Sequence, residues 1–172
     1  MKNILSELSL GMNTAFINSA VNSNLAYRPE FVSNDHKKGK KVLASLEWEL
    51  ENCDAFFISV AFITKSGITP LLQTLKTLEE KRIPGRILTT DYLMFSDPEA
   101  MEILNSLKNI EVRMFCTNSN GKSEGFHTKG YIFEKEEVYR IIIGSSNMTL
   151  SAITTNKEWN TKIVSTRDGE MA

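Results

Sequence analysis

The sequence is poor in several features that mark specialised classes of protein. It has 2 cysteines in 172 residues, and Cys53 and Cys116 lie at a spacing that matches no metal-binding motif. With so few cysteines and no signal peptide, we expect a reducing cytoplasm as the compartment. The longest apolar stretch, residues 55–63, is too short to cross a bilayer. These absences argue against a disulfide-stapled secreted scaffold and against a membrane-anchored protein.

The chain also lacks an excess of charge of either sign. Its formal net charge is -1 at pH 7, which argues against a protein that is basic over its whole surface. A local basic patch is compatible with this balance. The four lysines that cluster near the start, Lys37, Lys38, Lys40 and Lys41, are candidate contacts to a DNA backbone. A merely solvated loop explains them equally well.

What the sequence does contain is an alternation of helical and strand patterns. We expect an α/β fold with one core and a mixed, largely parallel sheet, flanked by helices on both faces. Residues 1–34 are expected to form an N-terminal arm that packs on a partner, with a loop over 24–34, and residues 35–172 the domain. Helices are predicted at 40–51, 67–82, 97–107 and 149–156, and strands at 54–64, 86–90, 110–116, 126–133, 138–143 and 158–165.

The most informative stretch joins His127 and Lys129 to the run Gly144-Ser145-Ser146-Asn147. Residues two apart on a strand point to the same face, so His127 and Lys129 should project side by side. The next strand leads to Gly144, where a sharp turn lets Ser145 and Asn147 offer donor groups to an anion. The pattern predicts a nucleophile or general base beside a fixed positive charge. Taken alone, the histidine is better explained as an ordinary side chain of a half-buried hairpin, and the neighbouring motif residues reverse that preference.

These residues resemble the His-x-Lys, Gly-Ser-x-Asn signature of the phospholipase D-like superfamily. The resemblance implies that His127 attacks phosphorus to form a phosphohistidine, while Lys129, Ser145 and Asn147 bind the phosphoryl oxygens, with no metal or other cofactor. The family also has an acidic residue within an Asn-x-Glu run, which here is Asn156-Lys157-Glu158. Glu158 is therefore the candidate for holding the histidine in its reactive tautomer. The alternative is that Glu158 is a solvated charge.

Two positions depart from the family pattern. Glu134 stands where the family usually has aspartate, and its place on the opposite strand face from His127 indicates a structural acid. The gap that follows is longer than usual, and we expect residues 135–137 to form an extended hairpin turn.

Only one copy of the motif is present, whereas the family chemistry uses one histidine to attack and a second to move protons. The other histidine, His36, precedes a charge run without a Gly-Ser-x-Asn partner, so we do not expect it to act. The second histidine should therefore come from His127 of another copy, in a two-fold dimer with one shared active site.

Residues 13–165 resemble more closely the phospholipase D-like domain at the N-terminus of some bacterial DEAD/DEAH-box helicase proteins. We therefore expect this chain to be a piece of a longer helicase-type protein, although no phosphate-binding loop of a motor is present in it. The leading hypothesis is a metal-independent nuclease-type phosphodiesterase acting on DNA. The alternative is a catalytically silent DNA-binding or dimerisation module of the helicase. Lipid cleavage ranks below both, because nothing suggests an interfacial surface.

Overall fold

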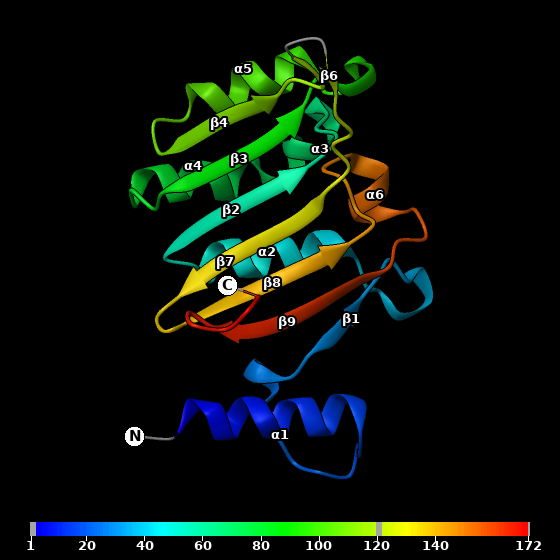
Figure 1. Ribbon diagram of the computed structural model, residues 1–172, viewed down its shortest axis with the longest axis vertical. Helices are drawn as coiled ribbons and strands as arrows, with labels where there is room; N and C mark the ends of the chain where they lie inside the picture. Colours follow the sequence, from blue (N-terminus) through cyan, green and yellow to red (C-terminus); the bar gives the residue numbers. More distant parts are fainter. Residues whose placement is uncertain (1–2, 120–121, 172) are drawn as a thin grey trace.

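A mixed sheet of seven strands runs through the computed structural model, which describes residues 3–119 and 122–171 (Figure 1). Its strands are β1 (Glu30–Val32), β2 (Ala55–Val60), β3 (Gly85–Thr90), β4 (Ile110–Phe115), β7 (Lys129–Lys135), β8 (Val138–Gly144) and β9 (Asn160–Thr166). The order is β1-β9-β8-β7-β2-β3-β4. The expected α/β class with a mixed sheet is confirmed.

The share of parallel pairing is smaller than expected. β3 pairs in parallel with β2 and β4, whereas β2–β7, β7–β8, β8–β9 and β1–β9 are antiparallel. The reason is the length of the connections. Helical crossovers join β2 to β3 and β3 to β4, but a two-residue turn joins β7 to β8, and a tight turn forces antiparallel pairing.

The helices are α1 (Ile4–Phe16), α2 (Val42–Asn52), α3 (Lys65–Ile68), α4 (Leu72–Glu80), α5 (Pro98–Ser106) and α6 (Leu150–Thr154). Those from α2 to α6 form one layer rather than two: in the described part of the chain, α2 contacts α4 and α6, and α3 contacts α5 and α6. Figure 1 shows α2 and α4 behind the sheet. The expectation of helices on both faces is therefore corrected.

Burial along β2 explains why the second face is open. Phe56, Ile58 and Val60 are buried and pack into the core with the helices, whereas Phe57 and Ser59 on the other face are half-buried. This is the alternation of a strand covered on one side.

Shorter elements complete the chain. The single-turn 3-10 helices are η1 (Leu25–Tyr27), η2 (His36–Lys38), η3 (Thr69–Leu71) and η4 (Tyr92–Met94), and β5 (Asn118–Ser119) pairs with β6 (Lys122–Ser123). The loop expected over 24–34 thus contains η1 and β1, and β1 pairs with β9 at the sheet edge. Helix α1 contacts η1 and stands apart from the sheet, with Phe16 and Ile17 exposed (Figure 1).

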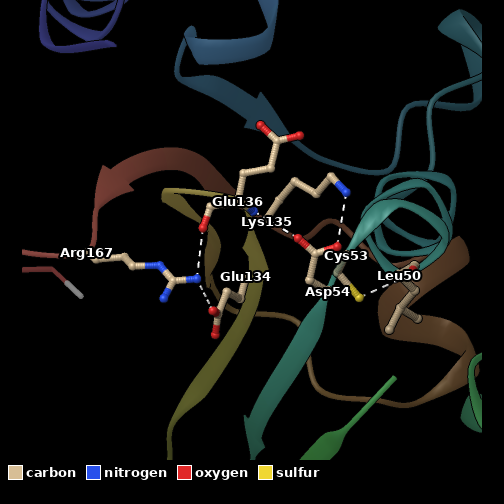
Figure 2. A network of polar contacts seen from close by, with 7 residues as sticks. All are labelled: Leu50, Cys53, Asp54, Glu134, Lys135, Glu136 and Arg167. Carbon is tan, nitrogen blue, oxygen red and sulfur yellow. Dashed lines mark hydrogen bonds and ion pairs between the residues drawn. The ribbon is translucent and has the colours of Figure 1, made fainter. Parts of the chain in front are cut away.

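The turn between β7 and β8 is tight, not extended. Lys135 pairs with Val138, so Glu136 and Glu137 alone form the turn, and Glu136 adopts a φ of 53°. Asp54 anchors it: one carboxylate oxygen contacts Lys135 Nζ at 3.0 Å and the other accepts the Glu136 N–H at 2.9 Å (Figure 2). These hydrogen bonds, chiefly that from Glu136, lower the pKa of Asp54.

Candidate active site

The motif residues gather at one edge of the sheet. Val60 at the carboxyl end of β2 pairs with Lys129 at the start of β7, and Gly144 at the end of β8 pairs with Asn160 at the start of β9. The carboxyl ends of two strands and the amino ends of two others therefore meet, and His127 lies two residues before β7. This topology brings together the two halves of the motif, His127 with Lys129 and the run that starts at Gly144, although Lys129 and Gly144 are 15 residues apart in the chain.

His127 and Lys129 are in direct contact, as their spacing predicts. Lys129 Nζ lies 2.9 Å from Nδ1 and 3.3 Å from Nε2 of His127, and it also donates to the His127 carbonyl at 3.2 Å. The strand begins at Lys129 rather than at 126. The contact places an ammonium directly beside the imidazole ring.

The segment that carries His127 is held although it lies outside the strand. The Thr128 carbonyl accepts the Ala61 N–H at 3.1 Å, and the hydroxyls of Thr128 and Ser59 are 2.7 Å apart. The Phe62 ring meets the imidazole edge-on, with centroids 6.2 Å apart. These contacts fix an exposed imidazole against the end of β2.

Lys129 is half-buried, and burial lowers the pKa of its ammonium below the ordinary range. The negative charge of Glu158 acts in the opposite direction. A partly desolvated ammonium keeps less of its hydration shell, so a phosphate oxygen that reaches it displaces less water.

Ser145 and Glu158 form the second half of the site. The Ser145 hydroxyl donates to the Glu158 carboxylate and accepts the Trp159 N–H at 3.0 Å, while the Ser145 N–H donates to the Trp159 carbonyl at 3.1 Å. Glu158 was expected to hold His127. In the described part of the chain, no carboxylate oxygen lies within hydrogen-bond distance of the His127 ring, and Glu158 engages Ser145 instead.

Asn147 is oriented through its carbonyl. Its Oδ1 accepts the Phe62 N–H at 3.2 Å, so its amide nitrogen is the group that can donate to an anion. Phe62 thereby links both motif halves, because its backbone orients Asn147 and its ring meets His127.

A buried layer beneath the site was not foreseen from the sequence. Asn160 is 2% exposed; its amide donates to Ser146 Oγ at 2.9 Å and to the Val32 carbonyl at 3.2 Å, and its Oδ1 accepts the Ser146 N–H at 3.3 Å. The Tyr131 hydroxyl donates to the Ser146 carbonyl at 3.0 Å. Ser146 is therefore the fixed centre from which its neighbours Ser145 and Asn147 project. The asparagine directly after Glu158-Trp159 is the one signal that could have indicated it.

Gly144 is required by close approach rather than by a sharp turn. It is the last residue of β8, and a β-carbon there would lie 2.2 Å from the Trp159 carbonyl oxygen and 2.5 Å from Asn160 Oδ1. Only glycine lets β9 come near enough for Ser145 to reach Trp159.

Glu134 and the lysine cluster lie away from His127. Glu134, near the far end of β7, accepts a hydrogen bond from Arg167, which also donates to the Glu136 carbonyl at 2.8 Å (Figure 2).

In the lysine cluster, the Lys38 ammonium pairs with the Asp35 carboxylate at 3.9 Å. Lys40 and Lys41 line a cavity beside α2, whereas Lys37 lines a different cavity together with Glu158. Lys37 thus shares a cavity with one motif residue, Glu158.

Three further properties bear on the expectations from composition. Cys53 is buried, which raises the pKa of its thiol to about 11, and Cys116 is exposed; both are free. No helix within residues 3–119 and 122–171 is long and apolar enough to span a bilayer. Across these same residues, no three His, Cys, Asp or Glu side chains come together as a metal-binding group.

Comparison with known proteins gives a family match and several similar folds. The family model described as "Cardiolipin synthase, PLD-like domain" matches residues 53–170. NucT from Helicobacter pylori superposes with a TM-score of 0.62 at 15% identity, covering 78% of this chain and 84% of that one. Nuc from Salmonella typhimurium, a phospholipase D family member, gives 0.56 at 17% identity, with 79% and 83% covered.

A larger protein shares the fold over part of its length. A variant of yeast tyrosyl-DNA phosphodiesterase 1 superposes with a TM-score of 0.51 at 14% identity, over 78% of this chain and 31% of that one. At these identities the structural matches establish the fold alone. No curated protein matches the sequence closely enough to count as a relative.

Proposed function

Since the chain belongs to the phospholipase D-like family, whose model matches residues 53–170, we propose that it cleaves phosphodiester bonds of DNA by a metal-independent, two-step mechanism. The observation that carries this proposal is the contact of 2.9 Å between Lys129 Nζ and His127 Nδ1, at the sheet edge where Ser145 and Asn147 also lie. A nucleophile, a cation and two polar donors are thereby gathered where one phosphate can meet them.

In the first step, the lone pair of a ring nitrogen of His127 attacks phosphorus, and the bond from phosphorus to the leaving oxygen breaks. The leaving oxygen takes a proton from the second histidine. In the next step, water attacks the phosphohistidine and gives its proton back to the second histidine, so that the P–N bond breaks and His127 is regenerated. Lys129 and the Asn147 amide stabilise the negative charge on the non-bridging oxygens throughout.

In this proposal, Glu158 orients the groups that bind the phosphate, Ser145 and Lys129. It accepts from Ser145 and its charge acts on Lys129, so it holds both in place for the substrate. The family role of holding the histidine requires the carboxylate to turn away from Ser145 towards His127. That role stays a prediction.

The second histidine is proposed to be His127 of another copy of the chain, in a two-fold dimer. An exposed apolar loop beside the site supports this: Leu93, Met94 and Phe95 are 59%, 82% and 55% exposed. The Phe95 ring packs against Phe62, which in turn meets His127. Exposed apolar side chains of this size favour burial against a partner, and a partner seated there would lie next to the imidazole.

Two observations support DNA as the substrate. One protein of similar fold is a tyrosyl-DNA phosphodiesterase, and the positively charged Lys37 lines the cavity that Glu158 also lines.

Attachment to a helicase motor and a place in the cytoplasm are also predictions. Sequencing the complete gene tests the first, and fractionation of cells that express the tagged protein tests the second.

The experiment compares cleavage of a labelled DNA by the wild type, His127→Ala and His36→Ala, each with and without EDTA. We expect His127→Ala to lower the rate by at least about 1,000-fold, while His36→Ala and EDTA leave it unchanged. Cleavage that survives His127→Ala, or that EDTA removes, contradicts the proposal.

A silent DNA-binding or dimerisation module is the competing function. The bond of Glu158 to Ser145 rather than to His127 favours it, because the histidine then lacks a carboxylate partner. Tight DNA binding, without turnover of DNA, of a chromogenic phosphodiester or of a phospholipid, identifies this module.

A further inference from the structure

A cavity of ≈ 470 Å³ opens beside Glu158, on the side away from β7. It is lined by Ser33, Asn34, Asp35, Lys37, Lys157, Glu158 and Trp159. Its volume lies in the range of small-ligand sites. Because Glu158 forms part of its wall, whatever occupies the cavity lies next to the proposed phosphate position.

Trp159 presents an aromatic surface at this cavity. The residue is 74% exposed, and its ring is braced edge-on by the half-exposed Phe31 with centroids 5.8 Å apart and an interplanar angle of 81°. Its backbone is fixed by two hydrogen bonds with Ser145, at 3.0 and 3.1 Å. The indole is therefore largely exposed, while Phe31 contacts its ring and Ser145 holds its backbone. This is the arrangement of a platform on which a flat ring can stack.

The floor of the cavity is rigid. Asn34 is 3% exposed; its amide donates to the carbonyls of Ala152 and Asn156 at 2.8 Å each, and its Oδ1 accepts the Val42 N–H at 2.9 Å. Asn34 thus ties β1, α2 and α6 together under the opening. The cavity is therefore formed before any ligand enters, which lowers the entropic cost of binding.

Four charged residues line the cavity: Lys37 and Lys157 can meet an anion, whereas the carboxylates of Asp35 and Glu158 are bonded to other groups. Lys37 and Lys157 are exposed, and neither forms an ion pair with a residue that the structure describes. Asp35 also lines the cavity, but its carboxylate is occupied by the N–H groups of Lys37 and Lys38 at 3.1 and 3.3 Å and by the Lys38 ammonium at 3.9 Å. Two ammonium groups beside an aromatic face recognise a phosphate joined to an unpaired base.

We propose that this cavity is a nucleotide subsite for single-stranded nucleic acid, in which the base next to the scissile phosphate stacks on Trp159 and the neighbouring phosphates contact Lys37 and Lys157. A base that is paired in a duplex keeps both faces covered and cannot stack on the indole. The inference rests on the proposed function, because it places the scissile phosphate at His127. It adds that the strand is unpaired beside the cut.

The test measures binding of a fluorescent oligothymidylate and of a fluorescent hairpin duplex by anisotropy, with His127→Ala as the background that prevents turnover. Trp159→Leu should weaken binding of the single strand by about 5- to 100-fold and leave the duplex within about 2-fold, whereas Trp159→Phe should recover most of the affinity. Trp48→Leu is the matched control, since Trp48 is also half-exposed but lines another cavity. It should change neither affinity.

Salt dependence tests the two lysines. Each of Lys37→Gln and Lys157→Gln should reduce the slope of log Kd against log salt concentration by about 0.7, the value for one lost contact with a single-stranded phosphate backbone. Lys76→Gln, on helix α4, serves as the control and should leave the slope unchanged. Unchanged slopes in both cavity variants would overturn the phosphate part of the proposal.

The outcomes separate this inference from the proposed function. Cleavage that needs His127 but not Trp159 leaves the function standing and overturns the subsite. Binding that needs Trp159, without any cleavage by the wild type, leaves the subsite standing and removes the enzyme. Equal losses on single strand and duplex in Trp159→Leu also overturn the subsite, because stacking of an unpaired base cannot cause them.

Discussion

The ammonium of Lys129 lies 2.9 Å from Nδ1 of His127, so the cation and the proposed nucleophile are in direct contact. A phosphate that reaches the imidazole therefore meets the ammonium at the same point. The pair places the positive charge proposed to bind the substrate beside the ring proposed to attack it.

The first prediction concerns the alkaline side of the pH–rate profile. Burial lowers the pKa of Lys129 below its ordinary value of 10.5, and substrate binding requires the protonated form, so cleavage should decline at a lower pH than an ordinary lysine would cause. Lys129→Arg keeps a positive charge at every accessible pH and should lose this decline while retaining part of the rate. Rates measured across the alkaline range with both proteins check it. An identical decline in the arginine variant would assign the titration to another group.

The second prediction is that Ser145 and Glu158 act as a unit. Because the Ser145 hydroxyl donates to the Glu158 carboxylate, either Ser145→Ala or Glu158→Gln removes most of the contribution that this hydrogen bond makes to kcat/KM. The double variant should therefore be impaired hardly more than the worse single variant, with a coupling of about 0.5–3 kcal/mol in kcat/KM. Simple additivity of the two effects would show that the bond has no part in catalysis.

The third prediction concerns the exposed loop of η4. Met94 is 82% exposed, and we expect it to be covered in the dimer. Met94→Glu should shift the light-scattering mass from that of two chains to that of one, and cleavage should fall with it because the second histidine is lost. Met171→Glu, at a half-exposed methionine near the chain end, is the control and should leave mass and rate unchanged. A monomer that cleaves at the full rate would contradict the shared site.

The fourth prediction is that Asn160 stabilises the fold as well as the site. Asn160→Ala removes two donated hydrogen bonds and one accepted bond in a buried position, which should lower the free energy of unfolding by about 2–4 kcal/mol. Urea denaturation measures this value. Thr161→Ala, at the next and exposed position of β9, should stay within about 0.5 kcal/mol of the wild type. A similar small effect at both positions would show that the buried network is dispensable.

The fifth prediction is a pH dependence of stability that arises from Glu49. This carboxyl is 1% exposed, and burial raises its pKa, although Arg140 and Lys162 oppose the shift. A raised pKa means that the folded state binds the proton more tightly than the unfolded state, so this group's contribution to the free energy of unfolding falls as pH rises above its ordinary value of 4.5. Glu49→Gln removes that decline, so the difference between wild type and variant should change as pH rises above 4.5. A constant difference would contradict the shift.

The sequence was sufficient for those parts of the site that rest on local periodicity. His127 and Lys129 meet because residues two apart share a strand face, a rule that needs no tertiary information. The chain segments of the larger strands and helices were predictable for the same reason. The start of this strand was predicted three residues too early, because the residues around His127 are held by single contacts to β2 rather than by a ladder.

The parts of the site and fold that the sequence did not predict depend on the register between strands that are distant in the chain. The bond of Ser145 to Glu158 follows from the pairing of Gly144 with Asn160, and the contact of Asn160 with Val32 joins residues 128 positions apart. Neither leaves a pattern in the sequence. The three-residue strand β1 is too short for an alternation to be recognised, so residues 24–34 looked like a loop. The open face of the sheet escaped prediction because half-buried residues such as Phe57 are as apolar as core residues.

The most direct test of the central claim is the covalent intermediate itself. A DNA substrate labelled on the strand that stays attached to phosphorus is mixed with the protein, quenched in denaturant within the first turnover, and resolved by denaturing electrophoresis and peptide mass spectrometry. The account predicts a protein–DNA adduct that maps to His127, rises before product, disappears on completion and is absent in His127→Ala. Product that forms at the full rate with His127 unmodified at every time point would contradict it.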